Sequence, residues 1–213
     1  MRSTPSSPDH SASEDDRTTR ARIRDEALRL VAAHGPDAVS VRRIAAAADV
    51  SPGLVLHHFG SKDGLREELD RHVLERCDAL LGELTGERPP GAEGSLAEAL
   101  AGHFPPESPL PGYLRRMLTS DGDAGRQLFR RLYEVSRDRL DGMVAAGTAS
   151  PGQDPAVRAA FLLVNDLAVV LLRERLTEAL GVDPLTAEGT DRWAPEVMAV
   201  YAAGIGARTG GPK

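Results

Sequence analysis

The chain has 213 residues, a formal net charge of −6 and one cysteine, Cys77. This length is enough for one large or two small domains with a buried core. A single cysteine excludes an internal disulfide and suits a reducing compartment. Apolar residues recur at helical spacing and strand signals are nearly absent, so the sequence predicts an all-α fold.

The charge is distributed unevenly along the chain. Residues 17–66 carry nine basic and five acidic side chains, a net charge of +4. Residues 1–16 carry −3 and residues 67–213 carry −7. A basic segment joined to an acidic body is typical of a protein in which only the basic part meets phosphates.

The sequence predicts neither secretion nor a membrane span. Its N-terminus lacks the apolar core of a signal peptide. Its longest apolar stretch, residues 159–172, is interrupted by Asn165 and Asp166 and is shorter than the roughly 18 residues that a span requires. We therefore expect a cytoplasmic protein without a membrane partner.

The N-terminal residues 1–16 are poor in apolar side chains, and we expect a disordered tail there. Residues 17–34 follow a helical period that a glycine-proline pair ends. Arg17 and Arg20 near the start of this helix are candidates to contact flanking phosphates or a minor groove. A solvated helix face explains them equally well.

Two short helices joined by a tight turn are predicted next. Ser40 supplies a hydroxyl cap for a helix that runs to Ala48, and Asp49 suits the left-handed backbone of a tight turn. Ser51 followed by Pro52 is a second start signal, because proline at the first helical position loses no hydrogen bond. This spacing is typical of a helix-turn-helix, whose second helix enters the DNA major groove.

One stretch of the sequence resembles the recognition segment of the TetR (tetracycline-repressor) family of bacterial regulators. It reads V-S-P-G-L-V-L-H-H-F-G-S-K-D-G-L at residues 50–65 and is preceded by V-R-R-I-A at residues 41–45. Two positions depart from the family's usual pattern. Leu56 stands where the family mostly carries a tyrosine that touches a DNA phosphate, and His57 beside it is a candidate replacement. Asp49 stands where the family mostly carries glycine, which is a mild backbone penalty.

We expect DNA contacts from exposed residues near the start of the second helix and from neighbouring cations. The candidates are Arg42, Arg43, Ser51, Pro52, Gly53, His57 and Lys62. The glycine and Leu54 offer close approach and contact with a thymine methyl, so hydrogen-bonded readout falls to the arginines, the serine or the histidine. Leu54 is alternatively a core residue. Lys62 at a helix N-terminus suits a phosphate, whereas His58 and Phe59 are expected to pack.

The sequence divides into a helix-turn-helix domain at residues 17–64 and a helical body at residues 65–208. Ser61 caps a helix that runs to about Leu84, and the resemblance implies that this helix connects the domains and swings when ligand binds. Further helices are predicted at residues 95–104, 113–118, 124–145, 155–180 and 192–206. The resemblance implies that the helices 155–180 and 192–206 pair with their symmetry mates in a homodimer interface.

Two polar residues, Asn165 and Asp166, lie within the most apolar predicted helix. Buried polar groups need partners, so these residues bond across the dimer, cap a neighbouring element or face a ligand cavity. The resemblance implies an effector pocket in the body, with a candidate lining of Phe104, Met117, Phe129, Tyr133, Asn165 and Asp166. Plain core is the alternative interpretation for the aromatic residues and the methionine.

The sequence contains no Gly-x-Ser-x-Gly elbow, no Walker loop and no His-Glu-x-x-His motif. His72 and Glu75 lie three residues apart but have no second pair to complete a metal site. We therefore expect no catalysis, cofactor or metal.

The resemblance implies a homodimeric repressor that binds a pseudo-palindromic operator in double-stranded DNA and is released by a small-molecule effector. The sequence identifies neither the effector nor the operator. The alternative is a helical ligand-binding or interaction protein that has lost specific DNA binding, which Leu56 and the apolar recognition helix suggest.

Overall fold

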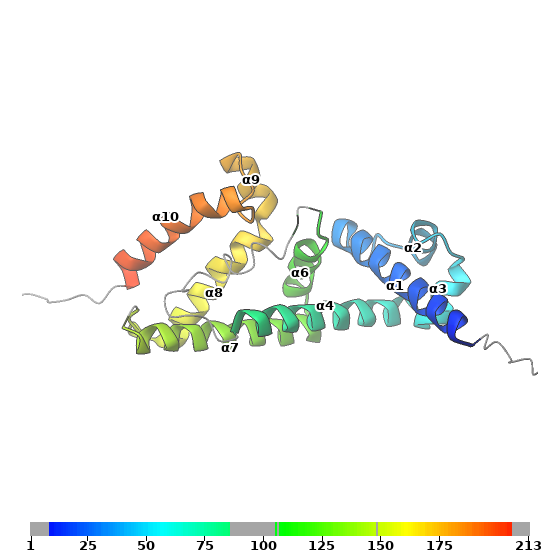
Figure 1. Cartoon of the computed structure of the whole chain (residues 1–213), viewed down its shortest axis with the longest axis horizontal. Coiled ribbons are helices and arrows are strands. Elements are labelled where there is room, and N and C mark those ends of the chain that lie inside the picture. The colour runs from blue at the N-terminus through cyan, green and yellow to red at the C-terminus, as the bar shows by residue number, and fades with distance from the viewer. Residues whose placement is uncertain (1–8, 86–104, 106, 148, 206–213) are drawn as a thin grey trace, which may run out of the picture. The chain divides into compact units, whose positions relative to one another are not determined.

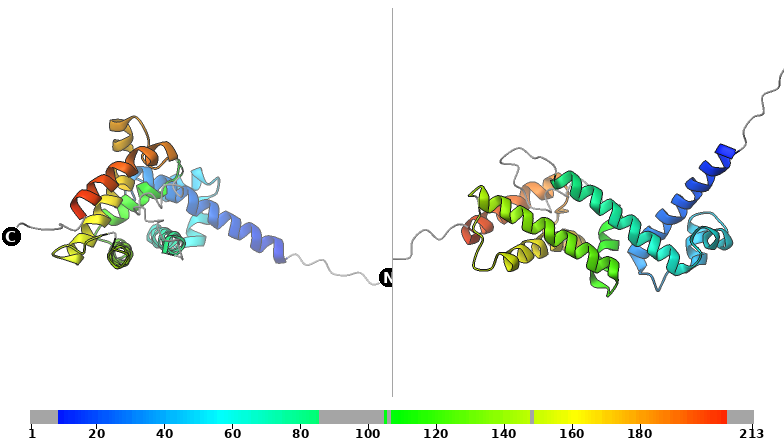
Figure 2. Two further views of the ribbon diagram at one scale, coloured as in Figure 1. Left: turned by 60° about the vertical axis from the view of Figure 1, so that its left-hand side comes forward. Right: turned by 90° about the horizontal axis from the view of Figure 1, so that it is seen from below.

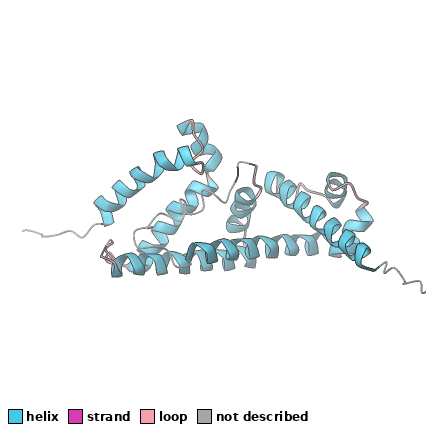
Figure 3. Ribbon diagram, viewed as in Figure 1, coloured by secondary structure: helices cyan, strands magenta, loops and turns pink. Residues whose placement is uncertain are grey.

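The computed structural model describes residues 9–85, 105, 107–147 and 149–205. These residues form helices joined by turns and loops, and no strand occurs among them (Figure 3). The all-α prediction is confirmed. The helices, which Figure 1 labels, are α1 (Asp9–His34), α2 (Val41–Ala47), α3 (Pro52–Phe59), α4 (Lys62–Thr85), α6 (Leu110–Thr119), α7 (Asp123–Ala145), α8 (Pro155–Leu171), α9 (Arg173–Leu180) and α10 (Ala187–Ile205). The predicted helix at residues 95–104 lies outside the described residues.

The chain contains two compact units, an N-terminal unit at residues 1–73 and a C-terminal unit at residues 74–213. The boundary between them lies inside α4, further along the chain than the predicted boundary after Gly64. One helix therefore contributes its first turns to one unit and its later turns to the other.

In the N-terminal unit, α1 packs against α2 and α3, and these two helices pack against each other. Apolar side chains that are less than a tenth exposed fill the core between them. They include Ile23, Ala27, Val39, Ile44, Ala45, Val55, Phe59, Leu65 and Leu69. On each helix the apolar residues recur with the helical period, so the hydrophobic effect turns one face of every helix inwards.

The helix α1 begins at Asp9, so the prediction of a disordered tail through residue 16 is wrong for residues 9–16. Residues 1–8 lie outside the described part of the chain. No glycine or proline interrupts the sequence between Asp9 and His34, so nothing in it stops the helix from beginning this early. The first turns of α1 extend past the other helices of this unit (Figure 2).

In the C-terminal unit, α7 packs against α8, which runs at an angle to it in Figure 1, and α6 packs against both. A close approach of α6 and α7 depends on Gly125, where an added Cβ would lie only 2.1 Å from the carbonyl oxygen of Met117. The buried hydroxyl of Ser136 on α7 donates a hydrogen bond of 2.8 Å to the carbonyl oxygen of Ala159 on α8. This bond satisfies a polar group that would otherwise destabilise the core.

The predicted helix 155–180 is wrong as a single element, because α8 and α9 meet at a bend of 73°. Leu172 at the bend has φ −104° and ψ 15°, outside the helical region. The next residue, Arg173, forms a two-pronged ion pair with Asp183 from the loop beyond α9, at distances of 2.6 to 3.0 Å. Asp183, the partner of Arg173, lies beyond the end of α9, so the helical periodicity of residues 155–180 does not predict the break.

The last helix begins earlier than predicted, at Ala187 instead of residue 192. The hydroxyl of Thr186 accepts a hydrogen bond of 3.2 Å from the backbone N–H of Gly189, which is the geometry of a helix cap. The helix α6 likewise begins at Leu110 instead of residue 113. Among the described residues no single helix is long and apolar enough to cross a membrane, and α8 and α9 reach that length only together, across their bend.

Candidate nucleic-acid interface

The turn between α2 and α3 has the backbone that its sequence predicts. Asp49 has φ +52°, the left-handed conformation that short polar residues tolerate better than branched ones. The backbone N–H of Val50 donates to the carbonyl oxygen of Ala45 at 2.9 Å and closes the turn. The predicted tight turn is therefore confirmed.

Three serine hydroxyls cap the helices around this turn, as predicted. Ser40 accepts a hydrogen bond of 3.2 Å from the backbone N–H of Arg43, and Ser51 accepts one of 3.2 Å from Leu54. Ser61 accepts one of 2.9 Å from Gly64 at the start of α4. These bonds satisfy N–H groups that have no partner within their own helix, and they fix where each helix begins.

The helix α3 buries one side and exposes the other. Val55 and Phe59 are 1% and 9% exposed and face the core. Pro52, Gly53 and His57 are exposed together on the opposite side. The structure thus brings the predicted recognition residues together on one solvent-facing surface, which we call the α3 face.

Leu56 also belongs to the α3 face, with 44% of its surface exposed. Its spacing of three residues from Gly53 was the signal that could have added it to the predicted contacts. Leu54 is half-buried, between the two alternatives of core and contact residue. An exposed leucine beside a glycine makes this face mainly apolar, with His57 as its hydrogen-bonding side chain.

The predicted cations belong to the helices directly before and after α3. Arg42 and Arg43 on α2 and Lys62 at the start of α4 are exposed. None of the three forms an ion pair with a described residue. Ser51 is exposed as well, but its hydroxyl oxygen already accepts the capping hydrogen bond. Exposed cations available to phosphates therefore lie on the helices before and after the exposed recognition helix.

The two candidate arginines near the start of α1, Arg17 and Arg20, lie within a regular helix. Arg17 and Arg20 are part of a helix that begins at Asp9, so neither belongs to an extended N-terminal arm. Arg20 pairs with Glu68 of α4 at 3.0 Å, and its guanidinium lies 5.3 Å from the centre of the Phe59 ring. A carboxylate and an aromatic ring within the protein thus hold Arg20, and the contact of these arginines with flanking phosphates stays a prediction.

The pair His58 and Phe59 packs, as predicted. The His58 side chain is 4% exposed and lies edge-on to the His57 ring, with 5.6 Å between the ring centres. Its Nε2 atom is 3.7 Å from a carboxylate oxygen of Asp16 and has no hydrogen-bond partner among the described atoms. His58 thus joins the end of α3 to the early part of α1.

The described ligand candidates lie on α6, α7 and α8 and differ in their exposure. Met117 is buried in the core at 5% exposure, whereas Phe129 is 43% exposed on α7. Tyr133 donates a hydrogen bond of 3.3 Å to the carbonyl oxygen of Ala156. Asn165 and Asp166 are half-buried on α8, where each has an interaction partner. Phe104 lies outside the described residues.

A different set of residues lines a small cavity in the C-terminal unit, of about 40 Å³. The lining is apolar apart from one thiol and comes from α4, α6, α7 and α8: Cys77, Leu80, Leu81, Leu114, Leu118, Leu128, Leu132, Leu167, Val170 and Leu171. Burial raises the pKa of the Cys77 thiol to about 12, and the neighbouring Asp78 carboxylate adds to the increase. Leucines at helical spacing look the same in a sequence whether they fill a core or line a cavity.

The described residues contain no cluster of three or more histidine, cysteine or acidic side chains that could hold a metal ion. What they do contain is a capped helix-turn-helix with an exposed second helix and flanking cations, followed by a separate helical unit. This combination defines the class of helix-turn-helix DNA-binding proteins with an appended helical body.

The comparisons with known proteins give the family. Residues 23–69 match the family described as bacterial regulatory proteins, tetR family, and residues 107–207 match the tetracyclin repressor-like C-terminal domain. The HTH-type transcriptional regulatory protein RaaS of Mycobacterium tuberculosis is 37% identical over 151 residues, which are 70% of this chain and 68% of that protein. The chain belongs to the TetR family of DNA-binding transcriptional regulators.

Other relatives match over less of the chain or in fold alone. The regulator BetI of Burkholderia thailandensis is 42% identical over 55 residues, 26% of this chain and 28% of that protein. A γ-butyrolactone receptor (ArpA-like protein) has 24% identity and a TM-score of 0.60 over 78% of this chain and 86% of its own. The Bacillus subtilis regulator FadR, solved with stearoyl-CoA, has 15% identity and a TM-score of 0.60 over 87% of this chain and 98% of its own. These two structures share the fold.

Proposed function

We propose that the protein is a homodimeric transcriptional repressor of the cytoplasm that binds a pseudo-palindromic operator through the α3 face. Each subunit would place the start of α3 in a major groove, with the two helices about one DNA turn, roughly 34–36 Å, apart. Arg42, Arg43 and Lys62 would contact phosphates or base edges beside it. A small-molecule effector that binds better to the DNA-incompetent arrangement would shift the population towards release.

Gly53 is the observation that carries the DNA-binding part of this proposal. It lies in the first turn of α3, where an added Cβ would meet nothing closer than the Ser51 hydroxyl oxygen at 3.8 Å. Packing within the protein therefore leaves room for a side chain. Glycine in a helix is nevertheless less favourable than alanine by about 0.5–1 kcal/mol. The lack of a side chain is explained if a partner outside the protein, such as the edges of the bases, approaches the helix backbone closely at this position.

The test compares Gly53→Ala with Gly142→Ala, a second exposed helical glycine whose Cβ would meet nothing within 4 Å. The probe is the DNA that flanks the protein's own gene. We expect both variants to unfold at the same temperature as the parent or higher, and only Gly53→Ala to weaken operator binding, by about tenfold. Equal binding by the two variants would show that α3 does not approach the bases at Gly53.

Phosphate contacts are tested separately by salt dependence. Operator affinity should fall steeply between two salt concentrations. A dimer of the Arg42→Ala plus Lys62→Ala variant loses two phosphate contacts in each subunit, so its slope of log affinity against log salt should be shallower by about four, because each contact contributes about one. A dimer that is folded but binds no DNA at either salt concentration would favour the alternative of a ligand-binding protein that has lost DNA recognition.

The cavity beside Cys77 is the place that we propose for part of the effector. Its lining carries no ionised group, so the portion of the effector bound there is apolar. At about 40 Å³ it must widen before it holds a whole ligand, and a site that opens only in one arrangement of the helices couples binding to conformation. The FadR and γ-butyrolactone receptor structures share the fold at low identity, so their ligands do not specify the effector of this chain.

A further inference from the structure

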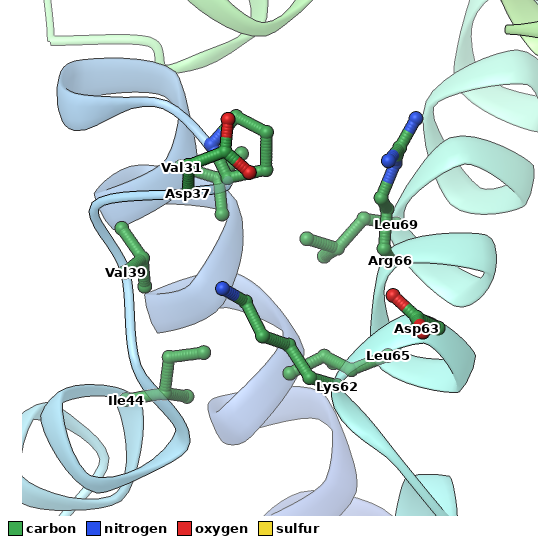
Figure 4. Close-up of a pocket in the computed structure, with 10 residues that line it drawn as sticks. Val31, Asp37, Val39, Ile44, Lys62, Asp63, Leu65, Arg66 and Leu69 are labelled. Atoms are coloured by element: carbon green, nitrogen blue, oxygen red, sulfur yellow. The ribbon is translucent and has the colours of Figure 1, made fainter.

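A second cavity lies within the N-terminal unit, about 100 Å³ in volume. It is enclosed by the end of α1, the loop between α1 and α2, the α2 helix and the first turns of α4 (Figure 4). All of these elements belong to the same unit as the helix-turn-helix. The volume exceeds the roughly 10–15 Å³ that one water molecule needs, so the cavity has room for a small organic molecule.

The cavity has an apolar floor and a charged rim. Its floor consists of side chains that are less than a tenth exposed: Val31, Val39, Ile44, Leu65 and Leu69. Its rim carries two cations, Lys62 and Arg66, and two carboxylates, Asp37 and Asp63, all of them exposed. An apolar floor beneath a charged rim is typical of sites for small amphipathic molecules.

Lys62 is the charged side chain that reaches over the floor. In Figure 4 its ammonium group extends from α4 towards the loop that carries Val39, away from the Asp63 carboxylate on the α4 side. No described residue forms an ion pair with Lys62 or Arg66. An ammonium above apolar side chains favours a ligand that brings its own negative charge and a short apolar tail.

The balance of charge selects the kind of anion. Residues 17–66 carry a net charge of +4, which attracts anions in general. Asp37 and Asp63 at the rim repel a compact group with two negative charges, such as phosphate. The rim carries as many carboxylates as cations, so a carboxylate with a single charge meets less repulsion there than a group with two charges. Lys62, whose ammonium extends over the floor, supplies its cationic partner, and its tail removes apolar surface from water in the cavity.

We propose that this cavity is a binding site for a small monocarboxylate with a short aliphatic tail. Such a ligand would hold its carboxylate against the Lys62 ammonium and its tail against Val39, Ile44 and Leu69. Because Lys62 is also a proposed phosphate contact, the ligand and DNA would compete for the same cation. This competition rests on the proposed DNA-binding function, whereas ligand binding by the free protein does not.

The direct test is a calorimetric titration of the full-length protein with 3-methylbutanoate. The neutral analogue 3-methyl-1-butanol and inorganic phosphate serve as probes of the tail and the charge taken alone. We expect 3-methylbutanoate to bind about fivefold tighter than either probe. Equal binding of the alcohol or of phosphate would overturn the proposal, since the site would then recognise only one half of the ligand. The absence of binding by 3-methylbutanoate would overturn it as well.

Two variants and a control locate the site. Lys62→Met keeps the aliphatic stem and should remove the preference for the carboxylate over the alcohol. Val31→Leu adds volume to the cavity wall and should weaken binding of both 3-methylbutanoate and 3-methyl-1-butanol. Its thermal unfolding should remain cooperative. Arg22→Gln removes another exposed cation of the same unit, away from the cavity lining, and should leave the affinity unchanged. Unchanged binding by Lys62→Met and Val31→Leu would place the carboxylate elsewhere.

Competition with DNA is measured last, on the operator fragment. Saturating 3-methylbutanoate should weaken operator binding by the parent protein and leave binding by Lys62→Met unaffected. A protein that binds the carboxylate but no DNA would contradict the proposed function and leave the carboxylate site intact. A protein that binds both at once without interference would contradict the placement of the carboxylate against Lys62.

Discussion

The guanidinium of Arg20 in α1 donates a hydrogen bond of 3.0 Å to a carboxylate oxygen of Glu68 in α4, and Arg71 donates to the same oxygen at 2.6 Å. Arg20 also lies over the ring of Phe59, the last residue of α3. The Glu68 side chain is only 11% exposed. One carboxylate thus links α1 and α4 through an arginine that also contacts the end of the recognition helix.

Replacing this carboxylate should destabilise the N-terminal unit. Glu68→Gln keeps the shape of the side chain but removes the negative charge, so both arginines lose their ionic partner and the glutamine amide offers them a single acceptor oxygen. We expect the free energy of unfolding in urea to fall by about 1–2 kcal/mol. The control is Glu26→Gln, which breaks a more exposed pair with Arg29 on the surface of α1 and should have little effect.

The same carboxylate should make stability depend on acid. Partial burial by itself raises the pKa of Glu68, but the hydrogen bond from Arg71 and the charges of Arg20, Arg71 and Arg24 outweigh it and hold the pKa below its ordinary value of 4.5. A carboxylate with a lowered pKa in the folded state stabilises the fold above its unfolded pKa and loses this contribution as the pH falls through the folded value. Urea unfolding measured at decreasing pH below about 5 should show a decline that Glu68→Gln makes shallower. An identical decline in both proteins would assign the acid sensitivity to other groups.

Asp183 gives a second acid-sensitive contact, in the C-terminal unit. Burial raises its pKa, but hydrogen bonds from Arg173 and from the Leu185 backbone N–H outweigh burial and lower the pKa overall. Asp183→Asn should cost about 3 kcal/mol, because it leaves the 11%-exposed Arg173 without its carboxylate. Arg175→Gln, in a fully solvated pair with Glu178, is the control and should unfold like the parent. If both variants unfolded alike, the ion pair at the α8–α9 bend would be dispensable.

Cys77 should be inert towards oxidants and alkylating reagents in the native protein. The thiolate is the reactive form, and burial keeps the pKa of this thiol at about 12. Iodoacetamide at neutral pH should therefore label the native protein far more slowly than the urea-unfolded protein, as followed by mass spectrometry. Rapid labelling of the native form would mean that the cavity beside Cys77 opens readily.

The helix-turn-helix could be predicted from sequence because its determinants are local. The hydroxyls of Ser40, Ser51 and Ser61 each accept a hydrogen bond from the backbone N–H three residues ahead, and Asp49 adopts the turn conformation that its side chain tolerates. Such contacts connect neighbours in the chain, so residue type and spacing are enough to predict them. The exposed side of α3 followed from the burial of its opposite side, at Val55 and Phe59.

Features that depend on distant partners could not be predicted in the same way. The pairing of Arg20 with Glu68 joins residues 48 positions apart, and the bend at Leu172 accompanies an ion pair with Asp183. The candidate ligand residues were selected as polar or aromatic exceptions within apolar helices. The cavity in the C-terminal unit is instead lined by leucines, whose chemistry gives no sign of the space beside them.

Subunit association is predicted to depend on an apolar row along α8. Val157, Phe161 and Val164 are 63%, 62% and 56% exposed and share one helical face through their spacing of four and three residues. A row of large exposed apolar side chains marks an interaction surface, and a surface on one helix meets its own copy across a two-fold axis.

Phe161→Glu would place two carboxylates near that axis, so we expect a folded monomer in sedimentation experiments. Because an operator with two half-sites binds a dimer, its affinity should fall together with dimerisation. Phe129→Glu, on the exposed side of α7, controls for loss of a surface phenylalanine and should remain dimeric. A dimer that survived Phe161→Glu would move the interface away from this row of α8.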